Sequence, residues 1–103
     1  MRFTLRQLEY FIAAGETGSI TRASERLNIS QPSISTAISQ LEKELGVQLF
    51  IRHHAQGLSL TPVGRTLLGE ARQLVGQAEA LHATASEASD TVSGTLNVGC
   101  LTT

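Results

Sequence analysis

Residues 19–45 constrain the fold more than any other part of the chain. They show two amphipathic patterns joined by a tight turn, with Asn28 where a left-handed backbone conformation is tolerated. Ser30 is suited to cap the second helix, and Pro32 falls in its first turn, where a missing N–H costs little. Gly46 marks the end of that helix. The segment therefore predicts a helix-turn-helix motif.

The second helix has an apolar back and a polar front with almost no charge. The back is a stripe at helical spacing, formed by Ile34, Ile38, Leu41 and Leu45. The front collects Gln31, Ser33, Ser35, Thr36, Ser39, Gln40 and Lys43. Serine and threonine are poor helix-interior residues, because their side chains compete for backbone hydrogen bonds. A solvated face is the simpler interpretation for an isolated helix, but the preceding tight turn favours a helix that enters a DNA groove.

A supporting helix precedes this motif. Thr4 and Gln7 form a T-x-x-Q capping-box pattern, and Gly15 and Gly18 mark the expected helix end. Its apolar residues recur at helical spacing at Leu5, Leu8, Phe11 and Ile12. We expect the helix to pack on the other two and to form a core of Phe11, Ile20, Ala23, Leu27, Ile34, Ile38 and Leu41.

Residues 47–60 predict a β-hairpin, because two short β-prone runs flank a polar loop at residues 52–57 that contains glycine. A hairpin attached to a helix-turn-helix is a wing. Arg52 and the adjacent His53 and His54 are expected near its tip, within reach of phosphates or a minor groove. The histidine pair also suits a metal site or a pH switch. No carboxylate or cysteine lies nearby in the sequence, so we favour solvated or phosphate-facing histidines and predict no metal site.

A long helix is predicted over residues 62–90, with Thr61 as its cap and Pro62 at its first position. Leucine and alanine then recur at alternating spacings of four and three, at Leu67, Ala71, Leu74, Ala78, Leu81, Ala85 and Ala88. So narrow a stripe favours pairing with a second helix over packing back on the chain's own domain, which is the alternative. The pattern leaves a parallel or an antiparallel pair open.

Charge is distributed unevenly along a chain of net charge −1. Residues 1–65 hold seven basic against five acidic side chains, whereas residues 66–103 hold one arginine against four acidic side chains. This asymmetry is too modest to identify a DNA-binding protein by itself. The single Cys100 excludes an internal disulfide, and no signal peptide or membrane-spanning apolar run is evident. We expect a cytoplasmic protein.

The ordered motifs resemble those of the LysR-type bacterial transcriptional regulators. In chain order they are Leu8 to Phe11, Gly18 to Thr21, Ala23 with Leu27, Ser30 to Pro32, Ile34 with Ser35, Ile38, Leu41 with Glu42, Leu45 with Gly46, Leu49 with Phe50, Arg52, and Leu60 and Thr61 with Gly64. Each is weak alone, and their common order and spacing make the resemblance specific.

The resemblance implies a mainly α fold with three parts. Residues 1–61 would form a winged helix-turn-helix DNA-binding domain, and residues 62–90 a linker helix that dimerises. Residues 91–103 would be a hinge and, at 95–98, the first strand of an effector-binding domain. The family binds interrupted palindromes in double-stranded DNA, commonly as tetramers, and senses a small molecule through that further domain. No cofactor is implied for the present segment.

The resemblance also carries site residues over by position. Residues 31, 33, 35 and 36 fall where members touch base edges or nearby phosphates, Arg52 at the minor groove or backbone, and Thr21 at a phosphate. Many members have arginine where Thr36 stands and a basic residue near Ala55, so we expect fewer guanine contacts and more recognition of DNA shape. The full candidate set is Thr21, Gln31, Pro32, Ser33, Ser35, Thr36, Ser39, Gln40, Lys43, Arg52 and His53.

Two other function classes compete with DNA binding. A helical dimerisation module could use the helix-turn-helix to bind protein instead of DNA. An enzyme is disfavoured, because no nucleophile, base and orienting group can be assembled and no glycine-rich phosphate loop is present. Glu42 and Glu44 are expected to form a solvated face or to pair with neighbours of Lys43.

Overall fold

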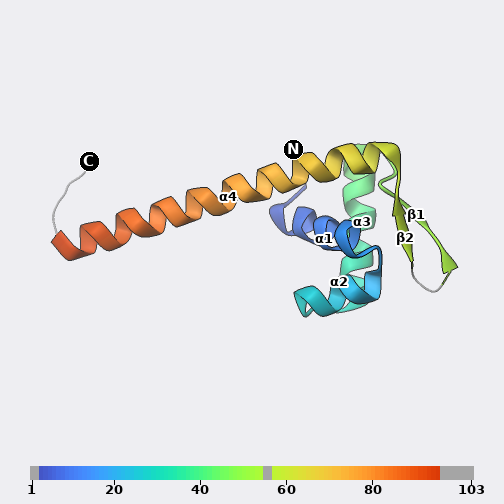
Figure 1. The fold of residues 1–103 in the computed structure, drawn as a ribbon, viewed down its shortest axis with the longest axis horizontal. Helices are drawn as coiled ribbons and strands as arrows, with labels where there is room; N and C mark the ends of the chain where they lie inside the picture. Colours follow the sequence, from blue (N-terminus) through green and yellow to red (C-terminus); the bar gives the residue numbers. More distant parts are fainter. Residues whose placement is uncertain (1–2, 55–56, 96–103) are drawn as a thin grey trace.

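The structure, a computed structural model, describes residues 3–54 and 57–95, and the side chains of these up to residue 89. The elements are α1 (Leu5–Thr17), α2 (Ile20–Leu27), α3 (Gln31–Leu45), β1 (Phe50–Arg52), β2 (Leu58–Leu60) and α4 (Pro62–Thr95). Figure 1 shows that α1–α3 and the two strands gather at one end of the molecule, from which α4 extends as a long rod. We call this gathered part the head. The mainly α, winged helix-turn-helix architecture is confirmed.

The helix boundaries follow from the predicted caps. The Gln7 N–H donates to the Thr4 hydroxyl at 3.1 Å, and the Thr4 N–H donates to the Gln7 side-chain oxygen at 2.9 Å, so the capping box is present. Gly18, Asn28 and Gly46 end α1, α2 and α3 with left-handed φ values of 67°, 58° and 73°. The tight turn at Asn28 is therefore confirmed.

The core lies where α1, α2 and α3 meet. Every residue of the expected three-helix core is buried there, except Leu27, which is half-buried and packs against it. Leu5, the first residue of the apolar stripe on α1, is 48% exposed and stays outside this core. The wing and α4 also enter this core, through Leu49, Phe50, Leu58, Leu68 and Ala71. The rings of Phe50 and Phe11 meet edge to face with centroids 5.5 Å apart, so the start of the wing contributes to the core.

The wing, residues 47–60, forms the expected antiparallel hairpin. Phe50 lies opposite Leu60, and Arg52 lies opposite Leu58. Arg52 is thus the last residue of β1 and not part of the tip loop, which corrects the expected position. The Leu58 N–H donates to the Gly18 carbonyl at 3.0 Å, so the hairpin is also tied to the turn between α1 and α2.

The start of α4 packs closely on the head. A Cβ placed at Gly64 would lie 2.2 Å from the Leu49 carbonyl oxygen, so only glycine permits this approach. Gly15 was expected near the end of the first helix but lies within α1, where an added Cβ would sit 3.2 Å from a methyl carbon of Leu68. The long helix continues to Thr95, five residues past its expected end at residue 90. Of the expected strand at residues 95–98, only Thr95 is described, as helix; the rest, with Cys100, lies outside the described residues.

Candidate nucleic-acid interface

The front of α3 is an uncovered polar surface. Pro32, Ser33, Thr36, Ser39, Gln40 and Lys43 are exposed, and Gln31 and Ser35 are half-buried. The opposite side of the helix is buried through Ile34, Ala37, Ile38 and Leu41. Two shallow hollows open on the front, one over Ser35, Thr36, Ser39, Gln40 and Lys43 and one over Pro32, Ser33, Thr36, Ala37 and Gln40. The predicted recognition residues of α3 therefore share one outward surface.

Two of these side chains have partners within the chain. The hydroxyls of Ser33 and Ser30 are 2.8 Å apart, as part of the α3 cap. The Gln7 side-chain amide donates to the Gln40 side-chain oxygen at 3.2 Å, which ties α3 to the start of α1. Across the described residues, no side-chain hydrogen bond is recorded for Gln31, Ser35, Thr36, Ser39 or Lys43. These five are available to an external ligand.

A groove separates the start of α3 from the wing. It is lined by Ile20, Gln31, Pro32, Ser35, Arg52, His53, Gly57 and Leu58, and we call it the α3–wing groove. Buried Ile20 and Leu58 give it an apolar floor, while Gln31 and Arg52 supply polar groups from opposite sides. The fold thus brings together recognition-helix and wing residues that the sequence separates widely.

The remaining predicted DNA-contacting residues differ in their surroundings. The exposed His53 has its Nε2 atom 2.8 Å from the Ser59 hydroxyl, across the hairpin. Thr21 is half-buried in the first turn of α2, and its carbonyl accepts a hydrogen bond from the Ser24 hydroxyl at 2.7 Å. Thr21 does not line the α3–wing groove.

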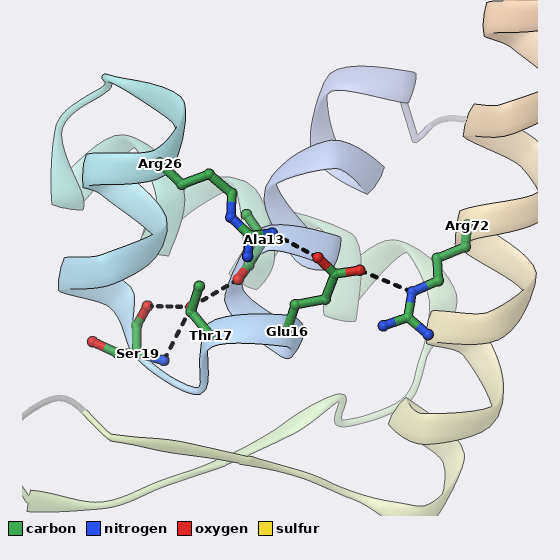
Figure 2. Close-up of polar contacts among 6 residues, drawn as sticks. All are labelled: Ala13, Glu16, Thr17, Ser19, Arg26 and Arg72. Carbon is green, nitrogen blue, oxygen red and sulfur yellow. Dashed lines mark hydrogen bonds and ion pairs between the residues drawn. The ribbon is translucent and has the colours of Figure 1, made fainter.

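Glu16 joins three helices, a role that sequence reasoning missed. Its carboxylate accepts from Arg26 Nη1 of α2 at 2.6 Å and from Arg72 Nε of α4 at 3.0 Å (Figure 2). The hydrogen bond from Arg26 is the main cause that lowers the pKa of the Glu16 carboxyl; Arg72 lowers it further, and slight burial opposes both. The three residues lie far apart in the sequence, and no short-range spacing pattern links them.

Glu42 has a structural partner, which corrects the expectation of a solvated carboxylate. Its Oε2 atom accepts from the backbone N–H groups of Leu49 at 2.8 Å and Phe50 at 3.2 Å. The acceptor comes from α3 and the donors from the start of the wing. Two sequence signals marked Glu42: its position beside the core residue Leu41 near the end of α3, and its place among the family motifs.

The expected dimer stripe on α4 has two parts. Ala71 is buried and Leu67 half-buried, and both pack on the chain's own head. Farther along, Leu74 is 45% exposed and Leu81 73% exposed, Ala78 is half-buried and Ala85 is exposed. Among the described residues of the stripe, the uncovered apolar side chains thus lie in this distal part.

Neither a metal-binding cluster nor a membrane-spanning helix is found in the described part of the chain. Within residues 3–54 and 57–95, no group of three histidine, cysteine or acidic side chains is placed to hold a metal ion. No helix in the described part of the chain combines the length and apolarity needed to cross a membrane.

The sequence of the chain is similar to those of known proteins. Residues 5–65 match the model of the bacterial regulatory helix-turn-helix proteins of the lysR family. The uncharacterised HTH-type transcriptional regulator YvbU of Bacillus subtilis is 38% identical over 100 residues, which cover 97% of this chain and 34% of YvbU. The HTH-type transcriptional regulator ClcR of Pseudomonas putida is 53% identical over 70 residues, covering 68% of this chain and 24% of ClcR. The chain thus spans a quarter to a third of the length of these relatives.

Solved structures of DNA-binding domains also superpose on this chain. The CbnR DNA-binding domain, crystallised with DNA, superposes with a TM-score of 0.79 at 38% identity, over 84% of this chain and 99% of that one. The BenM DNA-binding domain, in complex with benA site 1 DNA, superposes with a TM-score of 0.77 at 33% identity, over 84% of this chain and 97% of that one.

Proposed function

Because the chain belongs to the lysR family of bacterial regulatory helix-turn-helix proteins, we propose that it binds an interrupted palindrome in double-stranded DNA, with α3 in the major groove and Arg52 at the minor groove or backbone. The observation that carries this assignment is the α3–wing groove, where Gln31, Ser35 and Arg52 meet. A helix in the major groove and a wing beside it can contact one strand from two sides.

The front of α3 has the chemistry for reading bases. A glutamine such as Gln31 can pair with both hydrogen-bonding groups of adenine in the major groove, and the Thr36 methyl can contact a thymine methyl. Lys43 is the one cation among the proposed α3 contacts, so bidentate arginine–guanine pairs are absent from this helix face. Recognition then depends more on amide and hydroxyl contacts and on DNA shape.

The remaining proposed contacts position the protein on the duplex. Thr21, Ser33, Ser39, Gln40 and His53 would meet phosphates or sugars at the edges of the α3 surface. Such contacts carry little sequence information but fix the docking geometry. Arg52 supplies the main charge, and each neutralised phosphate steepens the decrease of log affinity with log salt by about 0.9.

We further propose that two copies pair through α4. The stripe begins at Leu67 and Ala71 on the head and continues through Leu74, Ala78, Leu81 and Ala85, and its uncovered distal part suits a second helix. A two-fold dimer matches the two halves of a palindrome. The family resemblance extends the proposal to a cytoplasmic, non-catalytic regulator that forms tetramers and responds to a small molecule through a domain that residues 91–103 lead into.

A fluorescence-anisotropy titration tests the DNA-binding proposal. The chain is titrated against a short interrupted palindrome and a scrambled duplex of equal composition, at two salt concentrations. We expect tighter binding to the palindrome and a steep decrease in affinity with salt. A dimer that binds neither duplex would instead support the protein-interaction alternative.

A further inference from the structure

We propose that Glu42 is a positioning residue for DNA binding, which holds the root of the wing on α3 so that Arg52 faces the duplex. This inference rests on the proposed function, because it assigns a role toward the same DNA surface. Glu42 itself lines neither the α3–wing groove nor the two hollows on the front of α3.

The first argument is the geometry of the Glu42 carboxylate. One oxygen accepts from two consecutive backbone N–H groups, those of Leu49 and Phe50, at 2.8 and 3.2 Å. Hydrogen bonds to a charged acceptor are stronger than neutral ones. Both donor residues are buried, so removing the carboxylate would leave two shielded N–H groups without this acceptor.

The second argument is that Thr61, the residue directly before α4, also holds the start of the wing. The Thr61 N–H donates to the Leu49 carbonyl at 3.0 Å, and the Thr61 hydroxyl donates to the Gln48 carbonyl at 2.6 Å. Figure 1 shows the end of α3 beside the start of α4 and the base of the hairpin. In the described part of the chain, no α3 side chain other than Glu42 has a recorded hydrogen bond to the wing. The Glu42 carboxylate is therefore the side-chain link between the recognition helix and the wing, in addition to the backbone hydrogen bond from the Val47 N–H to the Glu42 carbonyl at 3.3 Å.

The third argument is the alternation of side chains along β1. Phe50 and Arg52 point to the same face of the strand, because they are two residues apart, whereas Ile51 points to the other face and is 46% exposed. Phe50 enters the core, and Arg52 continues the same face into the α3–wing groove. Holding the Phe50 N–H thus fixes the rotation of the strand, and with it the direction of Arg52.

The test measures the affinity of the full chain for a palindromic duplex. Glu42→Ala is expected to weaken binding about tenfold, the size of one good contact, and to reduce the salt slope by about 1, which is also the reduction expected for Arg52→Ala. Glu44→Ala is the matched control, because Glu44 lies on the same helix and is exposed, with no recorded hydrogen bond or ion pair. It removes the same charge and should not reduce affinity.

A double variant separates positioning from general loss of structure. If Glu42 acts through Arg52, Glu42→Ala should cause little further loss in a chain that already carries Arg52→Ala. An equal loss in both backgrounds, or no loss in either, would overturn the inference. Failure of the unmodified chain to bind the palindrome would instead contradict the proposed function.

Folding is checked by circular dichroism and thermal unfolding of every variant, and affinities are measured where all of them are folded. Glu42→Asp provides a milder second variant, because it keeps the charge but shortens the side chain by one methylene. It should lose part of the affinity, and this loss should also depend on Arg52. A loss that follows the melting temperature and is independent of Arg52 would assign Glu42 a purely structural role.

Discussion

The head and the distal half of α4 are stabilised in opposite ways. In the head, short helices are capped at both ends and every element contributes to one core. In α4, every side chain from residue 79 to residue 89 is exposed. An isolated helix is only marginally stable in water, so the stability of the distal half of α4 depends on packing against another surface.

This difference shows where each part obtains its stability. The head buries its apolar side chains and pairs its backbone hydrogen-bonding groups within one chain. The distal part of α4 presents Leu81 to solvent in a single chain, which is typical of a surface that a second copy covers. Substitutions in the two regions should therefore change different measurable quantities.

The largest effect is expected in the core of the head. Phe11 is fully buried and meets Phe50 edge to face, so Phe11→Ala should lower the free energy of unfolding by about 3–5 kcal/mol. Urea denaturation followed by circular dichroism would measure this loss. A decrease below about 1 kcal/mol would indicate that the head is less tightly packed than the structure shows.

A pair of glycine substitutions tests the boundary between the two regions. Gly64→Ala places a methyl group against the Leu49 carbonyl, a backbone atom that cannot rotate away, and should destabilise the head by about 1–3 kcal/mol. Gly69→Ala, five residues along α4, is the matched control. Nothing lies within 4 Å of its added Cβ, so it should stabilise the helix by up to about 1 kcal/mol. Equal effects of both changes on the melting temperature would contradict the close approach at Gly64.

In the distal part of α4, a substitution should change association and leave the head intact. Leu81→Ala removes up to about 1.5–3 kcal/mol of apolar contact per paired leucine, while the unfolding of the head should change by less than about 0.5 kcal/mol. Sedimentation equilibrium would report the dimer dissociation constant. Gln73→Ala, at an exposed position outside the stripe, is the control. An unchanged dissociation constant for Leu81→Ala would place the dimer interface elsewhere.

Sequence reasoning found the features that depend on local chemistry. The caps at Thr4 and Ser30 and the left-handed turn at Asn28 depend on neighbouring residues and helical spacing, and all were predicted. The contribution of Leu49, Phe50 and Leu68 to the core was not, because it depends on how the wing and α4 fold back on the head.

In the candidate site, too, local features could be predicted and contacts between distant elements could not. The polar front of α3 could be predicted, because helical periodicity places its residues on one side. The contacts of Glu16 and Glu42 could not, because each joins elements whose relative placement no spacing pattern encodes. Arg52 was predicted to be in the wing but misplaced in the tip loop, because β1 continues one residue farther than its apolar run.

The smallest expected effect concerns Glu16, where the head is linked to the start of α4. Its pKa is lowered in the folded chain, mainly by Arg26, so it stabilises the fold at pH values above its unfolded pKa of about 4.5. This stabilisation is lost as the pH falls through the lowered folded pKa. Glu16→Gln should therefore reduce the free energy of unfolding at pH 6–7 and leave it unchanged at pH 2–3.

The size of this effect is limited by solvent, because all three side chains are partly exposed and such ion pairs contribute at most about 1 kcal/mol. Urea denaturation of the unmodified chain and of Glu16→Gln across this pH range would resolve the difference in the free energy of unfolding. Arg26→Ala should reproduce more of this loss of stability than Arg72→Ala, since Arg26 is the main cause of the lowered pKa of Glu16. A larger effect of Arg72→Ala would mean that the carboxylate mainly orients α4 on the head, and the linker helix would then be held at its base by charge as well as by the packing of Leu68.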